Sequence, residues 1–237
     1  MLTGWRGLLV GLVLTLAIPL AHADDWADCT NTDDAHQRIR GCTAIIDDRA
    51  STAQKRGIAH NNRGTAYHMK GDLDRAMEDF NLAIVIDPKK ANAYFNRGHI
   101  YRGKDDVNEA IKDYERAIAL NPKNATYLHA SCGLRAETGT DLERARANCD
   151  AALALENNPD ILFARGLVGI KQGFFDQAWA DYDAALQAKP GDAYYLYGRG
   201  IAALRLGRTA EGNADLVAAI QLDSMIAGEY ARLGVRP

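Results

Sequence analysis

The sequence has 237 residues, with 28 Lys and Arg against 31 Asp and Glu and a formal net charge of −3. Hydrophobic residues make up 47% and charged residues 25%. These are ordinary values for a folded chain, and they exclude a disordered tail and a multi-span membrane protein. Because the chain has no basic excess, it lacks the electrostatic footprint of a nucleic-acid-binding protein.

Residues 1–23 have the pattern of a secretory signal peptide. Arg6 provides a positive start, Leu8–Leu20 is a short apolar run, and small residues follow up to Ala23. We expect cleavage between Ala23 and Asp24. The alternative, an uncleaved membrane anchor, is disfavoured because the run is shorter than the ~20 residues that a spanning helix needs. The pattern predicts an exported protein, periplasmic in a Gram-negative bacterium and otherwise secreted, with no stable membrane span after cleavage.

From residue 57 onward the sequence repeats with a period near 34 residues, and three ladders of small residues stay in step over five units. The first ladder is Gly64, Gly98, Gly133, Gly166 and Gly200. The second is Ala76, Ala110, Ala145, Ala178 and Gly212, and the third is Ala83, Ala117, Ala152, Ala185 and Ala219. Two antiparallel helices approach closely only where side chains are small, so the ladders predict stacked helix pairs.

Each unit is predicted to form two helices joined by a polar turn. In the second unit we expect helices over residues 91–102 and 107–120, the second ended by Asn121 and Pro122. Proline lacks an N–H group and disfavours helix in the preceding residue. Pro88, Pro122 and Pro190 therefore mark the ends of units.

This pattern resembles the tetratricopeptide repeat, a helix–turn–helix motif of 34 residues. The unit that fits best carries Tyr94, Gly98, Tyr101, Ala110, Tyr114, Ala117 and Pro122 at the motif positions. The resemblance implies an all-α, right-handed superhelical solenoid of about five repeats. The predicted repeats are residues 57–90, 91–124, 126–158, 159–192 and 193–226. We expect capping helices in the segments 24–56 and 227–237, because stacked repeats leave an apolar face at each end.

An arginine–aspartate ladder runs through four of the five units. The arginine lies on the first helix, where the family usually has an apolar residue, and the aspartate lies on the second helix. The pairs are Arg63 with Asp79, Arg97 with Asp113, Arg165 with Asp181, and Arg199 with Asp215. We interpret them as structural ion pairs, because an unpaired buried arginine would be costly. The alternative is that some of these arginines reach a ligand carboxylate.

The third unit interrupts this ladder. It has Cys132 and Asn148 in place of the ion pair and adds Cys149, so two cysteines lie where its helices face each other. In an exported protein we predict a Cys132–Cys149 disulfide and a second disulfide between Cys29 and Cys42. Four cysteines allow three connectivities, and the other two stay open. The chain has no C-x-x-C motif and no spacing typical of zinc ligands.

The resemblance also implies where a ligand would bind, because first helices line the concave face of such a solenoid. The implied groove residues are Asn61, Thr65, His68, Asn92, Phe95, His99, Arg102, Tyr127, Leu134, Glu137, Phe163, Leu167, Lys171, Tyr194, Tyr197, Ile201 and Arg205. Aromatic residues are enriched at binding hot spots, so the groove suits an extended peptide or a partner helix. Packing between repeats is the alternative role of each aromatic residue. The lysine–asparagine pair with which some family members clamp a terminal carboxylate is absent.

The leading hypothesis is an exported scaffold or adaptor of the cell envelope that binds a protein or peptide without catalysis, cofactor or metal. One alternative is a small-molecule binder or enzyme that uses the groove. His129 lies one helical turn before Cys132 and is the candidate for activating a thiol in that case. Another alternative is a structural homo-oligomer in which exposed repeat ends stack on one another.

Overall fold

The computed structural model describes residues 22–31 and 33–237, and over these residues the chain forms thirteen α-helices and no strand. The predicted signal peptide lies outside the described residues as far as residue 21. The helices are α1 (His22–Thr30), α2 (Ala35–Asp47), α3 (Ala53–Met69), α4 (Leu73–Ile86), α5 (Ala91–Gly103), α6 (Val107–Leu120), α7 (Ala125–Thr138), α8 (Leu142–Leu155), α9 (Pro159–Gln172), α10 (Phe175–Ala188), α11 (Ala193–Arg205), α12 (Thr209–Leu222) and α13 (Ile226–Arg232).

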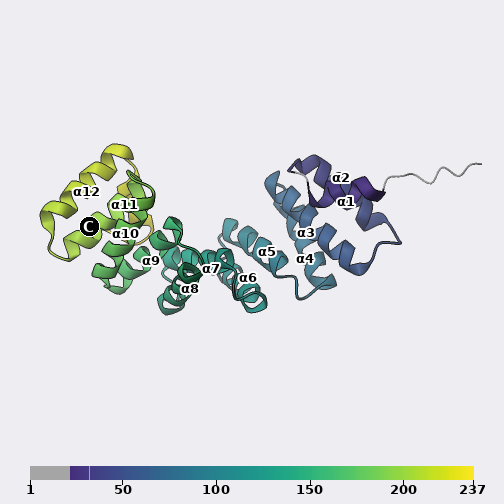
Figure 1. The fold of residues 1–237 in the computed structure, drawn as a ribbon, viewed down its shortest axis with the longest axis horizontal. Helices are drawn as coiled ribbons and strands as arrows, with labels where there is room; N and C mark the ends of the chain where they lie inside the picture. The colour runs from purple at the N-terminus through teal and green to yellow at the C-terminus, as the bar shows by residue number, and fades with distance from the viewer. Residues whose placement is uncertain (1–21, 32) are drawn as a thin grey trace, which may run out of the picture.

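Successive helix hairpins stack into an elongated arc, which runs from the α1–α2 hairpin at one end to α11 and α12 at the other (Figure 1). The predicted all-α solenoid is confirmed. Five hairpins, from α3–α4 to α11–α12, correspond to the five sequence units. In the second unit α5 extends one residue beyond the predicted helix, and α6 has the predicted bounds. Within the described residues, no helix has the length and apolar character needed to cross a membrane.

The N-terminal extension contains one more helix than the single capping helix that we predicted. α1 packs against α2 so closely that a Cβ atom at Gly41 would lie 2.6 Å from the main-chain oxygen of Asp25. The first repeat helix, α3, also begins four residues early, because the Thr52 hydroxyl accepts a hydrogen bond from the Lys55 amide and caps the helix there. The extension is therefore a complete hairpin stacked on the first repeat.

The ends of the repeat helices follow from short polar residues and glycines. Asp72, Asp106 and Asn124 each accept a hydrogen bond from the main-chain N–H three residues later, which satisfies a donor that the first helical turn leaves free. α7 and α9 end at Gly139 and Gly173, whose φ angles of 75° and 82° lie in the left-handed region that glycine adopts without strain.

The glycine ladder marks where the two helices of a hairpin touch. In three repeats an aromatic ring of the second helix covers the glycine of the first. A Cβ atom would lie 2.8 Å from Phe80 at Gly64, 2.8 Å from Tyr114 at Gly98, and 2.9 Å from Tyr182 at Gly166. The third repeat differs, because Cys149 stands in place of the ring and a Cβ atom at Gly133 would meet nothing within 4 Å.

This difference predicts opposite effects for one substitution at two equivalent positions. Gly98→Ala should destabilise the protein by about 1–2 kcal/mol, because the new methyl group overpacks against Tyr114 by more than its helix propensity gains. Gly133→Ala should stabilise it by about 0.5–1 kcal/mol, because the methyl group enters open space in a helix. Urea unfolding of both variants measures the two signs, and equal destabilisation would contradict this account of the third repeat.

The C-terminal end of the solenoid is only partly covered. α13 buries Tyr230 completely, with its ring centroid 4.9 Å from that of Tyr197 on α11. α12 nevertheless exposes Val217, Ile220 and Leu222, whose exposed fractions are 55%, 44% and 59%. The predicted capping helix therefore covers α11, and the outer face of α12 stays open.

Candidate functional site

The arginine of each predicted ion pair makes two parallel hydrogen bonds to its aspartate across the hairpin. The Nε and Nη2 atoms donate to the two carboxylate oxygens over 2.6–2.9 Å in all four pairs. The aspartates are buried, with exposed fractions of 2–8%. This geometry favours the structural interpretation, because the guanidinium groups have no bidentate face left for a ligand carboxylate.

Each of these arginines also binds a third helix. Its Nη1 atom donates over 2.6–3.0 Å to a side chain on the second helix of the preceding hairpin. The acceptors are Thr43 for Arg63, Asn81 for Arg97, Asp150 for Arg165, and Asp183 for Arg199. One guanidinium therefore holds three helices in register, which the pairing within a hairpin alone did not predict.

The surroundings of Asp79 and of Asp181 shift the pKa of the two carboxyl groups in opposite directions. Burial alone would raise the pKa of Asp79, but hydrogen bonds from His60 and Arg63 lower it below the usual value. Asp181 has no histidine partner, and burial raises its pKa although Arg165 opposes that shift. The ionised form of Asp181 therefore depends chiefly on Arg165, whereas two hydrogen-bonding partners stabilise that of Asp79.

The third repeat replaces its missing ion pair by a polar network that sequence reasoning did not find. Glu115 of the preceding repeat accepts hydrogen bonds from Ser131 and Arg135 over 3.1 Å each, from Arg144 over 3.0 Å, and from Asn148 over 3.3 Å. Glu115 occupies the repeat position that Asn81 and Asp183 hold in other units, and that equivalence was a usable signal. The network binds the second and third repeats together without the arginine–aspartate pair of the ladder.

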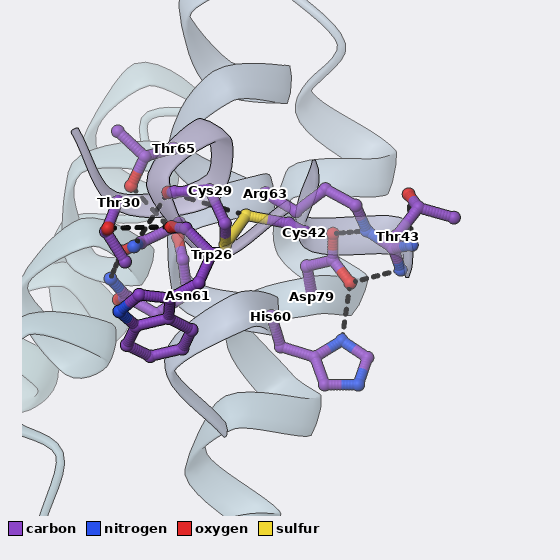
Figure 2. Close-up of a disulfide and its surroundings, with 11 residues drawn as sticks. Trp26, Cys29, Thr30, Cys42, Thr43, His60, Asn61, Arg63, Thr65 and Asp79 are labelled. Atoms are coloured by element: carbon purple, nitrogen blue, oxygen red, sulfur yellow. Dashed lines mark hydrogen bonds and ion pairs between the residues drawn. A yellow bond between two sulfur atoms is a disulfide. The ribbon is translucent and has the colours of Figure 1, made fainter. Parts of the chain in front are cut away.

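Both disulfides have the predicted connectivity. Cys29 and Cys42 join α1 to α2, with Cα atoms 4.6 Å apart, next to the Arg63–Asp79 pair and His60 (Figure 2). Cys132 and Cys149 join α7 to α8, with Cα atoms 5.4 Å apart. Since Cys132 is bonded to Cys149, it offers no thiol for His129 to activate.

Three adjoining cavities lie along the first helices of the later repeats and α13, and we call them together the groove. The proximal cavity, between α5 and α7, has a volume of about 320 Å³. The central cavity, between α7, α9 and the start of α11, has about 240 Å³, and the distal cavity beside α13 has about 320 Å³. Glu137 lines all three, and Gly133 lines the first two. The cavities thus adjoin one another at Glu137 and at Gly133, the ladder glycine that no side chain opposes.

Aromatic rings form the walls of the groove. Phe95 lies beside the proximal cavity, with its ring centroid 4.5 Å from that of His99 in an edge-on arrangement. Phe163 lines the central and distal cavities and meets Tyr194 edge-on at 6.0 Å. A bound chain would therefore contact ring faces and edges from the second repeat to the fifth.

Partners inside the protein hold the charged groups of the groove in place. Arg102 donates to both carboxylate oxygens of Glu137 over 2.7 and 2.9 Å. Hydrogen bonds from Lys189 and Tyr195 lower the pKa of Asp160. Burial lowers the pKa of His129, an effect that Asp160 opposes, so the ring favours its neutral form. The charged side chains of the groove are therefore held by hydrogen bonds within the protein itself.

Comparison with known proteins decides the family. Models of the tetratricopeptide repeat match residues 91–124 and 163–224, and a further model of the TPR repeat matches residues 64–105. The chain belongs to the tetratricopeptide-repeat family. No curated protein sequence gives a match.

Solved tetratricopeptide-repeat structures share the fold. YrrB, a TPR protein with an unusual peptide-binding site, aligns with a TM-score of 0.69 at 20% identity, over 82% of this chain and 98% of its own. A tetratricopeptide repeat protein from Parabacteroides merdae aligns with 0.67 at 17% identity, over 90% and 88%. PilW, a type IV pilus biogenesis factor, aligns with 0.63 at 17% identity, over 75% and 86%.

The tetratricopeptide-repeat groove positions only partly coincide with the cavities. Predicted residues that line them are Phe95, His99, Arg102, Glu137, Phe163, Leu167 and Tyr194. Tyr127, Leu134 and Tyr197 are 2–4% exposed, pack between helices and line none of the three cavities, so the structure does not bring them into the groove. Asn61 is also buried, and Thr65, His68 and Asn92 lie away from the three cavities.

Several residues that line the groove were missed. They are His129, Ala130, Gly133, Asp160, Asp192 and Tyr195. The usable signal was the combination of Gly133 with Cys149, because every other repeat opposes a large side chain, Phe80, Tyr114, Tyr182 or Leu216, to its glycine. A ladder glycine with no large side chain opposite it therefore predicts a cavity between the helices.

His99 gives the tetratricopeptide-repeat domain an acid-sensitive point. Burial lowers its pKa to about 4, and its Nδ1 lies 3.2 Å from the Tyr114 hydroxyl. The unfolded chain takes up this proton near pH 6.5 and the folded chain only near pH 4, so stability falls as the pH drops between these values. His99→Gln removes the titrating ring, so the variant should lose about 1–2 kcal/mol less stability than the wild type over this range of pH. This is less than the full pKa shift would give, because the ring is partly solvated. Urea unfolding at pH 7 and 4.5 tests it, and equal acid losses in wild type and variant would contradict it.

Proposed function

We propose that this protein is an exported scaffold or adaptor that binds an extended peptide segment of a partner in the groove. The observation that carries the proposal is the row of proximal, central and distal cavities, which all share Glu137 as a lining residue. The tetratricopeptide-repeat fold supports a protein-binding role in general. The peptide-binding site for which YrrB is described supports extending that role to this chain as a proposal.

The shape of the groove favours a peptide over a compact ligand. Sites for small molecules are usually single concave pockets of ~300–1,000 Å³ that enclose most of the ligand. Here the space is divided into three parts of about 240–320 Å³ that follow one another across the repeats. An extended chain with side chains of moderate size fills such a row of cavities.

Export is part of the proposal. The leader pattern of residues 1–23 and the two disulfides both suit an oxidising compartment outside the cytoplasm. In the described part of the chain, Ala23 and Asp24 lie in the first turn of α1. Expression with the native leader, fractionation and intact-mass measurement test the assignment. A mature mass that begins at Asp24 supports it, and an uncleaved chain retained in the cytoplasm rejects it.

Peptide display tests the binding role. Random 12-residue peptides are selected against the purified protein and against Phe163→Ala, which removes a wall, and Gly133→Leu, which fills the central cavity. Phe174→Ala is the matched control, because Phe174 is half exposed and packs on Arg146 outside the groove. Peptides that bind wild type and Phe174→Ala but neither groove variant support the proposal. Peptides that bind all four proteins equally reject the groove.

A second candidate function is self-association, which the open face of α12 favours. Val217 and Ile220, three residues apart on α12, form an apolar surface where a further repeat would stack. If this face joins copies, light scattering should give a mass above that of the monomer for wild type. Val217→Lys/Ile220→Lys should then restore the monomer mass. A monomeric wild type at high concentration excludes this candidate.

A further inference from the structure

A fourth cavity lies beyond the groove, where α9, α11 and α13 end together. Its volume is about 710 Å³, and Glu137 lines it as it lines the groove, so it continues the same surface. Four cationic side chains line it: Lys171, Arg205, Arg232 and Arg236. We call it the basic cavity. Such a concentration of positive charge stands out in a chain whose net charge is −3.

Most of this charge has no carboxylate partner within the described residues. Lys171 Nζ donates to the main-chain oxygen of Glu137 over 3.0 Å, and Arg205 Nη2 donates to that of Arg236 over 3.2 Å. Arg232 lies 3.4 Å from a carboxylate oxygen of Glu229. The one carboxylate that lines the cavity belongs to Glu137, and Arg102 already holds both of its oxygens.

Helix-end preferences explain only part of the arrangement. Cations in the last turn of a helix interact favourably with its dipole, and Lys171, Arg205 and Arg232 all occupy last turns. The same preference places Arg102 and Arg135 at the ends of α5 and α7, but those two arginines bind Glu137 and Glu115. In the fourth and fifth repeats, Lys171 and Arg205 lie in the last turns but donate to main-chain oxygens instead of carboxylates.

Partial burial adds to the cost of leaving these charges unbalanced. Burial lowers the pKa of Lys171, an effect that Glu137 opposes. An anionic group in the basic cavity would restore favourable charge pairing, and guanidinium groups bind carboxylates in two-point contacts. Ile170, Leu233 and Val235 add apolar surface for the rest of a side chain.

We propose that the basic cavity binds acidic side chains of the same peptide segment that occupies the groove. This inference rests on the proposed function and adds the chemistry of the partner: an apolar or aromatic stretch with aspartate or glutamate residues at one end. The occupant is a carboxylate-bearing peptide because the cavity is continuous with the groove through Glu137. Cations that act at an accessible site also make the binding sensitive to salt.

The experiment uses the display selection against three proteins: wild type, Lys171→Gln/Arg205→Gln, and the control Arg208→Gln. Arg208 lies outside the cavity, 3.8 Å from Asp176, and its replacement removes a charge from the same end of the molecule. One selected peptide is then synthesised with its acidic residues changed to the matching amides. Fluorescence anisotropy gives its affinity with each protein at low and high salt.

We expect the selected peptides to be rich in Asp and Glu at one end. The amide peptide should bind about tenfold more weakly to wild type, and the double variant should lose a similar factor for the acidic peptide. Arg208→Gln should bind like wild type. If neutral peptides are selected, lose affinity with Phe163→Ala and ignore the double variant, the charge inference is wrong and the groove function stands. If inorganic phosphate competes as well as the acidic peptide does, the cavity is a small-anion site and the peptide assignment is overturned.

Discussion

Arg165→Ala should lower the free energy of unfolding by about 3–5 kcal/mol, because it leaves Asp181 buried without its ionic partner. Asp181 is 3% exposed, and both of its oxygens accept hydrogen bonds from Arg165, over 2.6 and 2.9 Å. The same substitution releases Asp150 on α8, so the fourth repeat also loses a contact to the third. Urea unfolding at neutral pH measures the loss.

Two comparisons separate the buried pair from the contact between hairpins. Asp150→Ala removes only the half-exposed acceptor of Arg165, so it should cost less than about 1 kcal/mol. The deficit of Arg165→Ala should also shrink as the pH falls. Burial raises the pKa of Asp181 even with its arginine present, and an unpaired Asp181 takes up a proton more readily and ceases to be a buried charge. A loss for Arg165→Ala as small as that for Asp150→Ala would show that the pair contributes little.

The ladder shows what the spacing of residues can predict. Each arginine precedes its aspartate by 16 residues in all four repeats, and the hairpin geometry converts that constant spacing into the same two hydrogen bonds. The third contact was not predictable in the same way. Its acceptors differ in chemistry, Thr43, Asn81, Asp150 and Asp183, and they lie in the preceding hairpin, so they depend on how hairpins stack.

The groove was less predictable than the fold for a related reason. Positions on a first helix indicate which side chains point away from the partner helix of the hairpin. The angle at which neighbouring repeats stack decides which of these side chains reach open space. Tyr127 was expected in the groove, yet its ring packs 4.8 Å from that of Phe95 and is buried between repeats. Gly133 carries no side chain and was predicted only to bring two helices together, although it lines the central cavity.

The N-terminal extension illustrates a different limit of pattern reading. α1 is nine residues long, too short for a periodic pattern to identify, and its first two residues, His22 and Ala23, belong to the predicted leader. Its helix is stabilised by packing on α2 and by the Cys29–Cys42 disulfide rather than by its own sequence. The Asn62 side chain on α3 also donates to the main-chain oxygen of Cys29 over 3.1 Å, which fastens α1 to the first repeat.

Removing the Cys132–Cys149 disulfide should cost about 3 kcal/mol and should split the unfolding of the solenoid. The bond closes a loop with a sequence separation of 17, and a closed loop of that size restricts the unfolded chain by roughly this free energy. The third repeat has no arginine–aspartate pair at the ladder positions to replace it, since Cys132 and Asn148 stand there. Since each repeat contacts only its neighbours, weakening a middle repeat uncouples the repeats on either side.

The Cys29–Cys42 disulfide is the matched control, because its sequence separation of 13 predicts a similar entropic effect at the end of the chain. Cys132→Ala/Cys149→Ala should broaden the urea transition and speed hydrogen exchange throughout α7 and α8. Cys29→Ala/Cys42→Ala should speed exchange in α1 and α2 alone and leave the main transition in place. If both double variants keep a single sharp transition and exchange rapidly only at the N-terminus, the third repeat is held by the Glu115 network instead. The central disulfide would then serve chiefly to replace the aromatic ring and keep the groove open at Gly133.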